Sequence, residues 1–522
     1  MRWRNGWILF AFGLLIYGGM AVLQRTPGYM DAEYYYVGGR VLAEGHGFWE
    51  PFLWNYLDEP AGLPHPAFTY WMPLPALVAM LGMRLAGDVA FLWARLPFVI
   101  LAALTVPLTA WLAGRLRGDL KSGKTEWLAG GLALFGGFYL IYNSLTETFV
   151  LYFLLGALFL ACAFEELTPG LGFWRGAVLG VLAALMHLTR ADGLLWLVAG
   201  AAVLIWQGRG WRLRLLGVVG LLLVYGLVMS PWMGRNLAYY GRLMAPGGMR
   251  TLWLTDYNQT YVYPASVLTL QHWLDSGWRA IVSARWWALQ MNLKTTLGVQ
   301  GSVFLLPLMV VGLWRQRRKA WAQFVAVMWL MTLAVMTVVF PFAGARGGFF
   351  HSGAALQACL WAVVPQGLEQ TLAWVSRRRG WSRKQAGRVF SVGLVGLAFV
   401  FSVLVVNQQV VGVGLEGVDW ERSWKAHAAL REVEAPMDAV FMVNNPPGFY
   451  AVTGRPAIVI PDGDVVTVMA VARQYRATYL VLDQNAPAGL RDLYREPRDE
   501  GGLMYWKTIA GQHIFKIVLR EP

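Results

Sequence analysis

The sequence predicts a helical membrane protein with many spans, followed by a small α/β domain. Hydrophobic residues make up 57% of the 522 residues and charged residues only 14%, and the mean hydropathy is +0.45. Apolar stretches of roughly 17 to 25 residues, each long enough to cross a hydrocarbon layer, alternate with short polar loops. This composition excludes a soluble multidomain protein.

The basic residues predict how the spans are oriented. The net charge is +14, but the Lys and Arg residues gather beside apolar stretches and not in a nucleic-acid-binding module, so we expect no nucleic acid partner. The clusters are Arg2 and Arg4, Arg115 to Lys124, Arg209 to Arg214, Arg315 to Lys319, and Arg377 to Arg388. Positively charged loops remain in the cytoplasm. We therefore expect a multi-pass protein of the plasma or inner membrane with a cytoplasmic N-terminus.

About eleven transmembrane helices fit this arrangement with alternating directions. The predicted spans are 7–23, 89–114, 127–143, 149–165, two short spans within 174–206, 213–231, 297–314, 321–340, 354–374 and 389–410. The first span is followed by Gln24-Arg25-Thr26-Pro27, with no small-residue cleavage site, and is expected to be retained. Two prolines and Arg84 interrupt the apolar stretch Met72 to Ala86, so this piece is expected to lie in the membrane interface.

Two parts of different character are predicted. Residues 1–410 form the transmembrane module, in which 24–88 is a long outside loop with interfacial helices. Residues 413–522 form a soluble extracytoplasmic domain in which β-type runs at 439–443, 457–460 and 479–482 alternate with helical stretches at 422–434 and 465–477. The two cysteines, Cys162 and Cys359, lie in apolar runs and predict neither a disulfide framework nor a thiolate metal site.

Polar residues in unusual positions gather on the predicted outer side. Asp31 and Glu33 follow the first span, and Glu147 lies in a tight turn after the third, where a carboxylate is costly unless it is paired or functional. The other candidates, as substrate-binding residues, are Tyr35, His65, Arg95, Arg190, Asp192, Arg235, Arg346 and His351. Structural roles stay open for several of them. Glu33 and Asp192 can cap a helix or pair with an arginine, and Arg95 can extend its head group to the interface.

These residue types suit a reaction with an anionic leaving group. A carboxylate can take a proton from an attacking hydroxyl, and arginine can hold a phosphate and stabilise it as it departs. The aromatic residues around Tyr35 fit either a sugar-stacking surface or an interfacial belt. Asp31-Ala32-Glu33 has the alternate spacing of a metal pair, but with no third ligand evident the sequence assigns no metal site. A divalent cation is the only cofactor left open.

Several motifs resemble a known family, the GT-C-type polyprenyl-phosphate-dependent glycosyltransferases. The resemblance is to the bacterial relatives of protein O-mannosyltransferases and to the lipid A aminoarabinose transferase. The matching pieces are Asp31-Ala32-Glu33-Tyr34-Tyr35, the stretch from Pro64-His65-Pro66 to Ala94-Arg95-Leu96-Pro97, Leu188-Thr189-Arg190-Ala191-Asp192-Gly193, and Pro231-Trp232 with Arg235-Asn236. The similarity covers most of residues 1 to 410, with individually weak motifs in the correct order.

The resemblance implies a GT-C-like fold and an inverting transfer of a hexose or pentose from a polyprenyl-phosphate donor. It implies that Asp31 is the general base and that Glu147, the second outside acid, orients acceptor or sugar. Ala32 separates the two acids that are adjacent in protein O-mannosyltransferases, and the C-terminal domain lacks the features of their sugar-binding domain. The acceptor, whether glycan, lipid or protein, is therefore not predicted.

Two other classes of function remain open from the sequence. A lipid or sugar transporter could use the outside acids and the broken helix near Arg190 as a substrate gate. An assembly or sensor scaffold could act through the C-terminal domain. The polar residues gather on one face of the predicted bundle, which favours a one-sided transferase site over a transport path.

Overall fold

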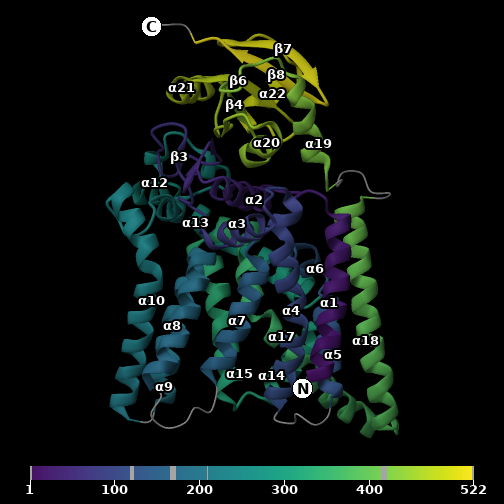
Figure 1. Ribbon diagram of the computed structural model, residues 1–522. Coiled ribbons are helices and arrows are strands. Elements are labelled where there is room, and N and C mark those ends of the chain that lie inside the picture. Colours follow the sequence, from purple (N-terminus) through teal and green to yellow (C-terminus); the bar gives the residue numbers. More distant parts are fainter. Residues whose placement is uncertain (1–2, 118–122, 165–171, 209, 413–419, 520–522) are drawn as a thin grey trace.

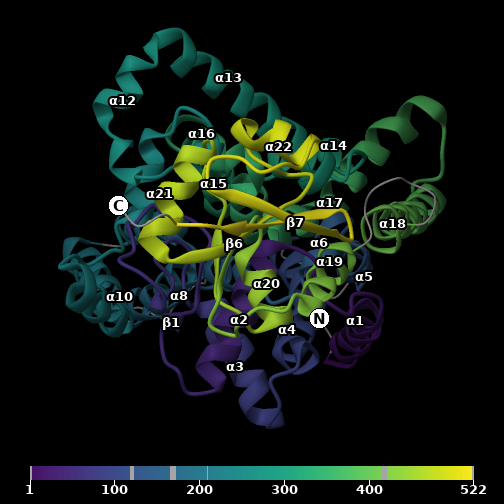
Figure 2. The same ribbon diagram turned by 90° about the horizontal axis from the view of Figure 1, so that it is seen from above.

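A helical bundle carries a sheet domain on one of its ends (Figure 1). The computed structural model describes residues 3–117, 123–164, 172–208, 210–412 and 420–519. The N-terminus lies at the end of the bundle away from the sheet domain (Figure 1). Viewed from above, the sheet domain covers the middle of the bundle (Figure 2). The expected basic residues Arg2, Lys121 and Arg209, and the expected domain start at 413, lie outside the described residues.

Seven helical segments of the described residues are long and apolar enough to cross a membrane, by length and composition. They are α1 (Trp3–Leu23), α4 (Phe91–Arg117), α8 (Gly172–Thr189), α10 (Trp211–Tyr240), α15 (Ala320–Ala334) with the π-turn Val335–Val339, α16 and α17 (Pro341–Ala343 and Phe349–Arg379), and α18 (Arg383–Val406) with Asn407–Val411. Their lipid-facing sides are rich in exposed Leu, Val and Trp. This confirms the expected polytopic helical membrane fold.

Shorter helices complete the bundle. They are α5 (Lys124–Leu134), α6 (Phe138–Tyr142), α7 (Phe149–Ala163), α9 (Leu194–Gln207), α13 (Gly277–Thr295) and α14 (Leu306–Arg315). Helical residues fall within the predicted spans, but two of the spans are divided. The span 127–143 is divided between α5 and α6, where Gly137 has a φ of +60°, and 297–314 is divided between the π-turn Thr296–Gln300 and α14. Helix α13, preceded by α12 (Leu270–Asp275), was not predicted because its Trp and Arg residues give it no apolar run.

The first outside loop folds onto the end of the bundle and is helical in two places. Helix α2 (Met30–Ala43) packs against α3 (Leu74–Ala86), and a Cβ on Gly39 would lie 2.8 Å from the Cβ of Ala79. Helix α3 falls in the stretch expected to be interfacial. The short strands β1 (Trp49–Glu50) and β3 (His65–Pro66) pair between the two helices.

The C-terminal domain has a six-stranded mixed sheet in the order β2-β5-β4-β6-β8-β7. Its strands are β2 (Phe52–Leu53), β4 (Val440–Val443), β5 (Ala457–Val459), β6 (Ala477–Leu482), β7 (Leu503–Ile509) and β8 (Gln512–Ile517), and its helices are α19 (Arg422–Ala429), α20 (Pro446–Thr453), α21 (Val465–Tyr475) and α22 (Arg491–Arg495). The three predicted strands correspond to β4, β5 and β6. The antiparallel strands β7 and β8 were not predicted. Strand β7 is mostly exposed or half-buried, whereas β8 is mostly buried, and neither shows a clear alternation of burial.

One edge of this sheet belongs to the first outside loop. Strand β2 runs parallel to β5, with Phe52 opposite Ala457 and Leu53 opposite Ile458. The two parts also touch at Gly28, where a Cβ would lie 2.0 Å from the Trp420 ring. The loop that carries α2 therefore contributes an edge strand to the sheet of the C-terminal domain.

Candidate active site

Helix α2 presents two carboxylates in its first turn, where the positive end of the helix dipole favours them. Their surroundings differ. The Asp31 side chain is 31% exposed, so a substrate can reach it. Glu33 is completely buried, and its Oε2 accepts a hydrogen bond of 2.6 Å from Nδ2 of Asn445 in the C-terminal domain. Glu33 therefore joins the two parts of the protein, whereas the Asp31 side chain stays partly exposed.

A buried turn between α6 and α7 presents Glu147. Thr146 Oγ1 donates a hydrogen bond of 2.7 Å to the carbonyl of Ala32, which ties this turn to α2. Arg95 supports the turn from below, donating to the carbonyl of Ser144 at 3.1 Å and to the carbonyls of Ala21 and Gln24 at the end of α1. Arg95, expected as a substrate-binding residue with extension to the interface as its structural alternative, has a buried guanidinium that fastens three segments together.

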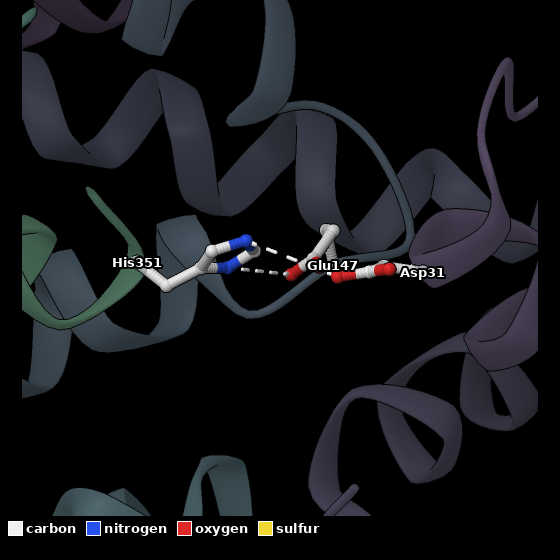
Figure 3. Close-up of side chains that lie close together, drawn as sticks. All are labelled: Asp31, Glu147 and His351. Carbon is white, nitrogen blue, oxygen red and sulfur yellow. Dashed lines mark ion pairs between the residues drawn. The ribbon is translucent and has the colours of Figure 1, made fainter. Parts of the chain in front are cut away.

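His351 lies beside both Asp31 and Glu147 (Figure 3). It follows a kink at the start of α17, where Gly347 has a φ of +121°. Its Nε2 is 3.9 Å from Asp31 Oδ2, and its Nδ1 is 3.7 Å from Glu147 Oε2 and 2.9 Å from Thr148 Oγ1. The ring stacks on Phe149 at 4.1 Å. Three segments far apart in the sequence thus meet at one point.

Asp31 and Glu147 both have raised pKa values. Burial raises the pKa of Asp31 to about 6, against the opposing effect of the Arg190 charge. Burial, and next the neighbouring Asp31 carboxylate, raise the pKa of Glu147 to about 8. Acids this close titrate as a pair, so at neutral pH they hold about one negative charge, mainly on Asp31. Asp31 is then a carboxylate of enhanced basicity beside a neutral Glu147.

Arg190 and Asp192 occupy the break between α8 and α9, in the short 3-10 turn Ala191–Gly193. Arg190 Nε bonds Asp192 Oδ1 at 2.8 Å, and the guanidinium lies 5.9 Å from the Tyr152 ring centre. Tyr152 donates to the other oxygen of Asp192 at 3.1 Å. The terminal nitrogens of Arg190 have no hydrogen bond with any described residue. Asp192 therefore orients a guanidinium whose outer donors remain available.

Arg346 is the second arginine near the acids. Its side chain is exposed at the kink before α17, and its guanidinium lies 4.9 Å from the Tyr257 ring centre. Burial raises the pKa of Tyr257, and the charge of Asp31 adds to this rise, whereas the charge of Arg346 opposes it. Among the described residues Arg346 has no ion pair or hydrogen bond, so an anion can reach it.

The remaining predicted residues have other neighbours. Arg235 donates to the carbonyl of Ala67 at 2.6 Å and lies over the Trp232 ring at 4.7 Å, which fixes the first loop against α10. His65 Nε2 is 3.2 Å from Glu50 Oε1 in the paired strands β1 and β3. Both groups are buried, and burial lowers the pKa of His65 to about 3. These two residues are held by the protein itself.

Tyr35 is buried on α2 between the acids and the aromatic residues of the first loop. Its ring lies 6.1 Å from the ring of Trp71. Burial, and next the charge of Glu147, raise its pKa well above the usual range. Tyr35 thus lies close to the acids but forms part of the wall around them.

The site contains a candidate cation site. Asp31, Glu147 and His351 each offer a ligand atom, and these atoms lie within 4.8 Å of one another. Carboxylate oxygen and imidazole nitrogen are ordinary ligands for Zn²⁺ or Mn²⁺, so the donor set fits a divalent cation. The sequence offered Asp31 and Glu33 as a metal pair with no third ligand. In the structure Glu147 takes the place of Glu33 beside Asp31, and His351 is the third ligand. A bound cation would hold both carboxylates in their ionised form.

Several contacts in the site were not foreseen from the sequence. Thr148, Phe149 and Tyr152 follow Glu147 and hold His351 and Asp192 in place. Their spacing along α7 matches one helix face, which is the only signal available in advance. Tyr257 and Asn445 carry no comparable signal, because they approach the acids from loops distant in sequence.

The bundle, the helical first loop and the outer sheet domain together define a polytopic membrane protein with the GT-C fold. The chain is similar to ArnT from Cupriavidus metallidurans, with a TM-score of 0.58 and 12% identity, over 98% of each chain. A second structure of that protein, bound to undecaprenyl phosphate, gives 0.52 and 14% over the same shares. The archaeal oligosaccharyltransferase AglB from Archaeoglobus fulgidus, in complex with an inhibitory peptide and a dolichol-phosphate, gives 0.57 and 13% over 92% of this chain and 70% of that one.

At these identities the likeness establishes the fold. No model of a known protein family matches the sequence, and no curated protein sequence matches it.

Proposed function

We propose that this protein is a membrane glycosyltransferase that moves a hexose or pentose from a polyprenyl-phosphate donor to an acceptor hydroxyl or amine. The observation that carries the proposal is the pairing of a partly exposed, basic Asp31 with a buried, neutral Glu147, near two arginines with available donors. The GT-C fold supports it, as do the lipid phosphates bound to the structures named above.

The proposed reaction inverts the anomeric centre. Asp31 takes the proton of the acceptor as its oxygen or nitrogen attacks the anomeric carbon. The bond from that carbon to the phosphate oxygen breaks, and the polyprenyl phosphate leaves with the electron pair. A general base of this kind accelerates a reaction by about 10²- to 10⁴-fold.

Arg346 and Arg190 are the proposed phosphate ligands. Both have guanidinium nitrogens that make no hydrogen bond with a described residue. The charge of Arg190 lowers the pKa of Asp31, and that of Arg346 lowers the pKa of Tyr257, each against the effect of burial. Arginine can bind a phosphate with two parallel hydrogen bonds and stabilise the charge that builds up on departure. Arg235 has no such role in this proposal, because its guanidinium is bonded to the first loop.

Glu147 is proposed to orient the sugar or the acceptor. Its carboxyl is buried behind Asp31, and burial keeps it neutral at physiological pH. A neutral carboxyl both donates and accepts a hydrogen bond, which suits a hydroxyl group. A second negative charge at this point would instead repel the donor phosphate.

The proposed site lies on the outer face of the membrane. Helix α2, whose first turn carries Asp31, lies at the same end of the bundle as the C-terminal domain, and the N-terminus is at the opposite end (Figure 1). The basic clusters of the sequence favour a cytoplasmic N-terminus. The C-terminal domain and the reaction are then extracytoplasmic.

The donor can be tested on purified protein by mass spectrometry of the co-purifying lipids. We expect a polyprenyl phosphate or its glycosylated form, and less of it bound to Arg346→Ala than to the wild-type protein. Reconstituted vesicles test the alternative of a transporter. Movement of a lipid-linked sugar across the bilayer without formation of a glycosylated product would overturn the proposal.

A further inference from the structure

A cavity lies between the C-terminal domain and the start of α2. Its volume is about 780 Å³, and its membrane-side wall includes Gly28, Tyr29 and Met30, the three residues directly before Asp31. Small-molecule sites commonly measure roughly 300 to 1,000 Å³. A ligand in this cavity would therefore contact the residues that lead into Asp31, although Asp31 itself is not among the lining residues.

The position of the cavity in the sheet is one where ligands bind. Four parallel strands run in the order β2-β5-β4-β6. Among the last three, the chain passes from β4 to β5 on one side and then crosses to β6 on the other side of β4. In open α/β sheets, the crevice at the carboxyl ends of such strands is the binding site. Asn444, Ile460 and Asp483 directly follow the three strands, and all three line the cavity.

Two buried polar side chains point to a ligand that is not part of the protein. His427 is 4% exposed, and neither of its ring nitrogens has a hydrogen-bond partner among the described residues. Gln512 is 6% exposed, and its Oε1 is likewise unpartnered within the described part of the chain. Both side chains line the cavity. Buried polar groups in folded proteins are normally satisfied, so each of these calls for a partner.

The lining favours an uncharged ligand rich in hydroxyl groups. Burial lowers the pKa of His427 to about 4, so at neutral pH its ring offers one donor and one acceptor. The lining carries two carboxylates, Asp462 and Asp483, and two guanidinium groups, Arg422 and Arg491, so its formal charges balance. Hydroxyl groups, which both donate and accept hydrogen bonds, suit such a lining. Helix α20 offers no phosphate cradle, because it begins with Pro446 and Pro447 and is capped by Asn445.

We propose that this cavity binds a neutral saccharide and is the acceptor subsite of the transferase. The role as acceptor subsite rests on the proposed function, whereas the binding of a saccharide does not. Tyr29 connects the two sites. It lines the cavity, and its hydroxyl is buried without a partner in the described residues, on the side of Glu147 and Asp31. An acceptor hydroxyl could reach Asp31 past this residue.

Saturation-transfer difference NMR on the full-length protein in nanodiscs tests the subsite. The probes are D-glucose, D-mannose, D-galactose and L-arabinose, with inorganic phosphate as the charged comparison. We expect at least one sugar to give a signal and phosphate not to displace it. The absence of any sugar signal, or its displacement by phosphate, would overturn the proposal.

The variant His427→Leu with Gln512→Leu removes the unpartnered groups at nearly constant volume. We expect its sugar affinity to fall about tenfold or more, since hydrogen bonds to buried groups are lost. Its melting temperature should stay equal or rise, because no internal hydrogen bond is broken. A lower melting temperature with unchanged sugar binding would show that these residues are structural and would contradict the subsite.

Two further variants separate the proposal of a saccharide site from the proposal of a transferase. His513→Leu lies next to Gln512 on β8 but outside the cavity, since neighbouring strand residues point to opposite faces, and should bind sugar normally. Asp31→Asn should bind sugar normally although transfer is lost. If the wild-type protein binds sugar but forms no glycosylated product, the transferase proposal fails and the saccharide site stands.

Discussion

Asn445 of the C-terminal domain donates a 2.6 Å hydrogen bond to Oε2 of Glu33, two residues after the proposed general base. The contact is tight, because a Cβ on Gly448 would lie 2.5 Å from the same oxygen. The outer domain is therefore docked directly on the helix that presents Asp31. Movement of that domain would be transmitted to the position of the base.

The contact predicts different consequences for the two acids of α2. Asn445→Ala leaves Glu33 buried without its partner, which should cost about 1–3 kcal/mol of stability and lower the melting temperature. Glu33→Gln keeps a neutral group able to bond Asn445, so transfer should remain within a few fold of wild type. A loss of transfer in Glu33→Gln as large as in Asp31→Asn would contradict a docking role.

Glu33 also predicts a pH dependence of stability. Burial raises its pKa from 4.5 to about 7, so the folded protein favours the protonated form. Its stabilising contribution is present at low pH and is lost as the pH rises through about 7. The melting temperature of the wild-type protein should thus fall more steeply between about pH 5 and 8 than that of Glu33→Gln. Equal slopes in the two proteins would show that Glu33 is not protonated in the folded state.

The acid pair predicts a bell-shaped pH dependence of transfer. Asp31 must be ionised to act as a base, so the rate should rise as the pH rises through about 6. Ionisation of Glu147 near pH 8 adds a second negative charge, so the rate should fall above that value. In Glu147→Gln the fall at high pH should disappear, while the rise at low pH remains. Persistence of the alkaline fall in this variant would assign it to another group.

The exposed guanidinium of Arg346 predicts an effect on donor affinity. Arg346→Ala should raise KM for a polyprenyl-phosphate sugar about tenfold or more, since a charge-assisted bond to phosphate is lost. Arg279→Ala is a matched control, because Arg279 also lies over an aromatic ring, that of Trp278, away from the acids. Equal KM values for Arg346→Ala and the control would remove Arg346 from the donor site.

The three side chains at the centre of the site predict binding of a divalent cation. Calorimetric titration with Mn²⁺ should show a site in the wild-type protein that weakens in Glu147→Gln and is retained in Glu33→Gln. Affinity should increase with pH, because the cation replaces the proton shared by the acids. Equal binding by Glu147→Gln and wild type would place the cation elsewhere.

Local patterns in the sequence were sufficient for much of the bundle and for the two acids. Apolar length predicts the helices, and a carboxylate in a turn between apolar helices identifies Glu147 as unusual. The partner of Glu33 could not be predicted, because Asn445 approaches it from another domain. For the same reason the pairing of β2 with β5 has no signal in either segment alone.

Four arginines show more clearly that the sequence alone does not predict the partners of a side chain. Arg95, Arg190, Arg235 and Arg346 are alike as residue types at the predicted outer end of the bundle. Which of them is available for a phosphate depends on the carbonyls that surround each guanidinium in the folded chain. Arg95 and Arg235 donate to backbone oxygens of distant segments, whereas Arg346 donates to no residue in the described part of the chain.

The most direct test is single-turnover transfer from a radiolabelled polyprenyl-phosphate sugar by Asp31→Asn, compared with wild type and Glu33→Gln. Asparagine keeps the shape of the side chain but cannot accept the proton of the acceptor. We predict that transfer by Asp31→Asn falls by about 10²-fold or more, with donor binding and melting temperature retained, while Glu33→Gln remains active. Transfer by Asp31→Asn at the wild-type rate would contradict Asp31 as the general base.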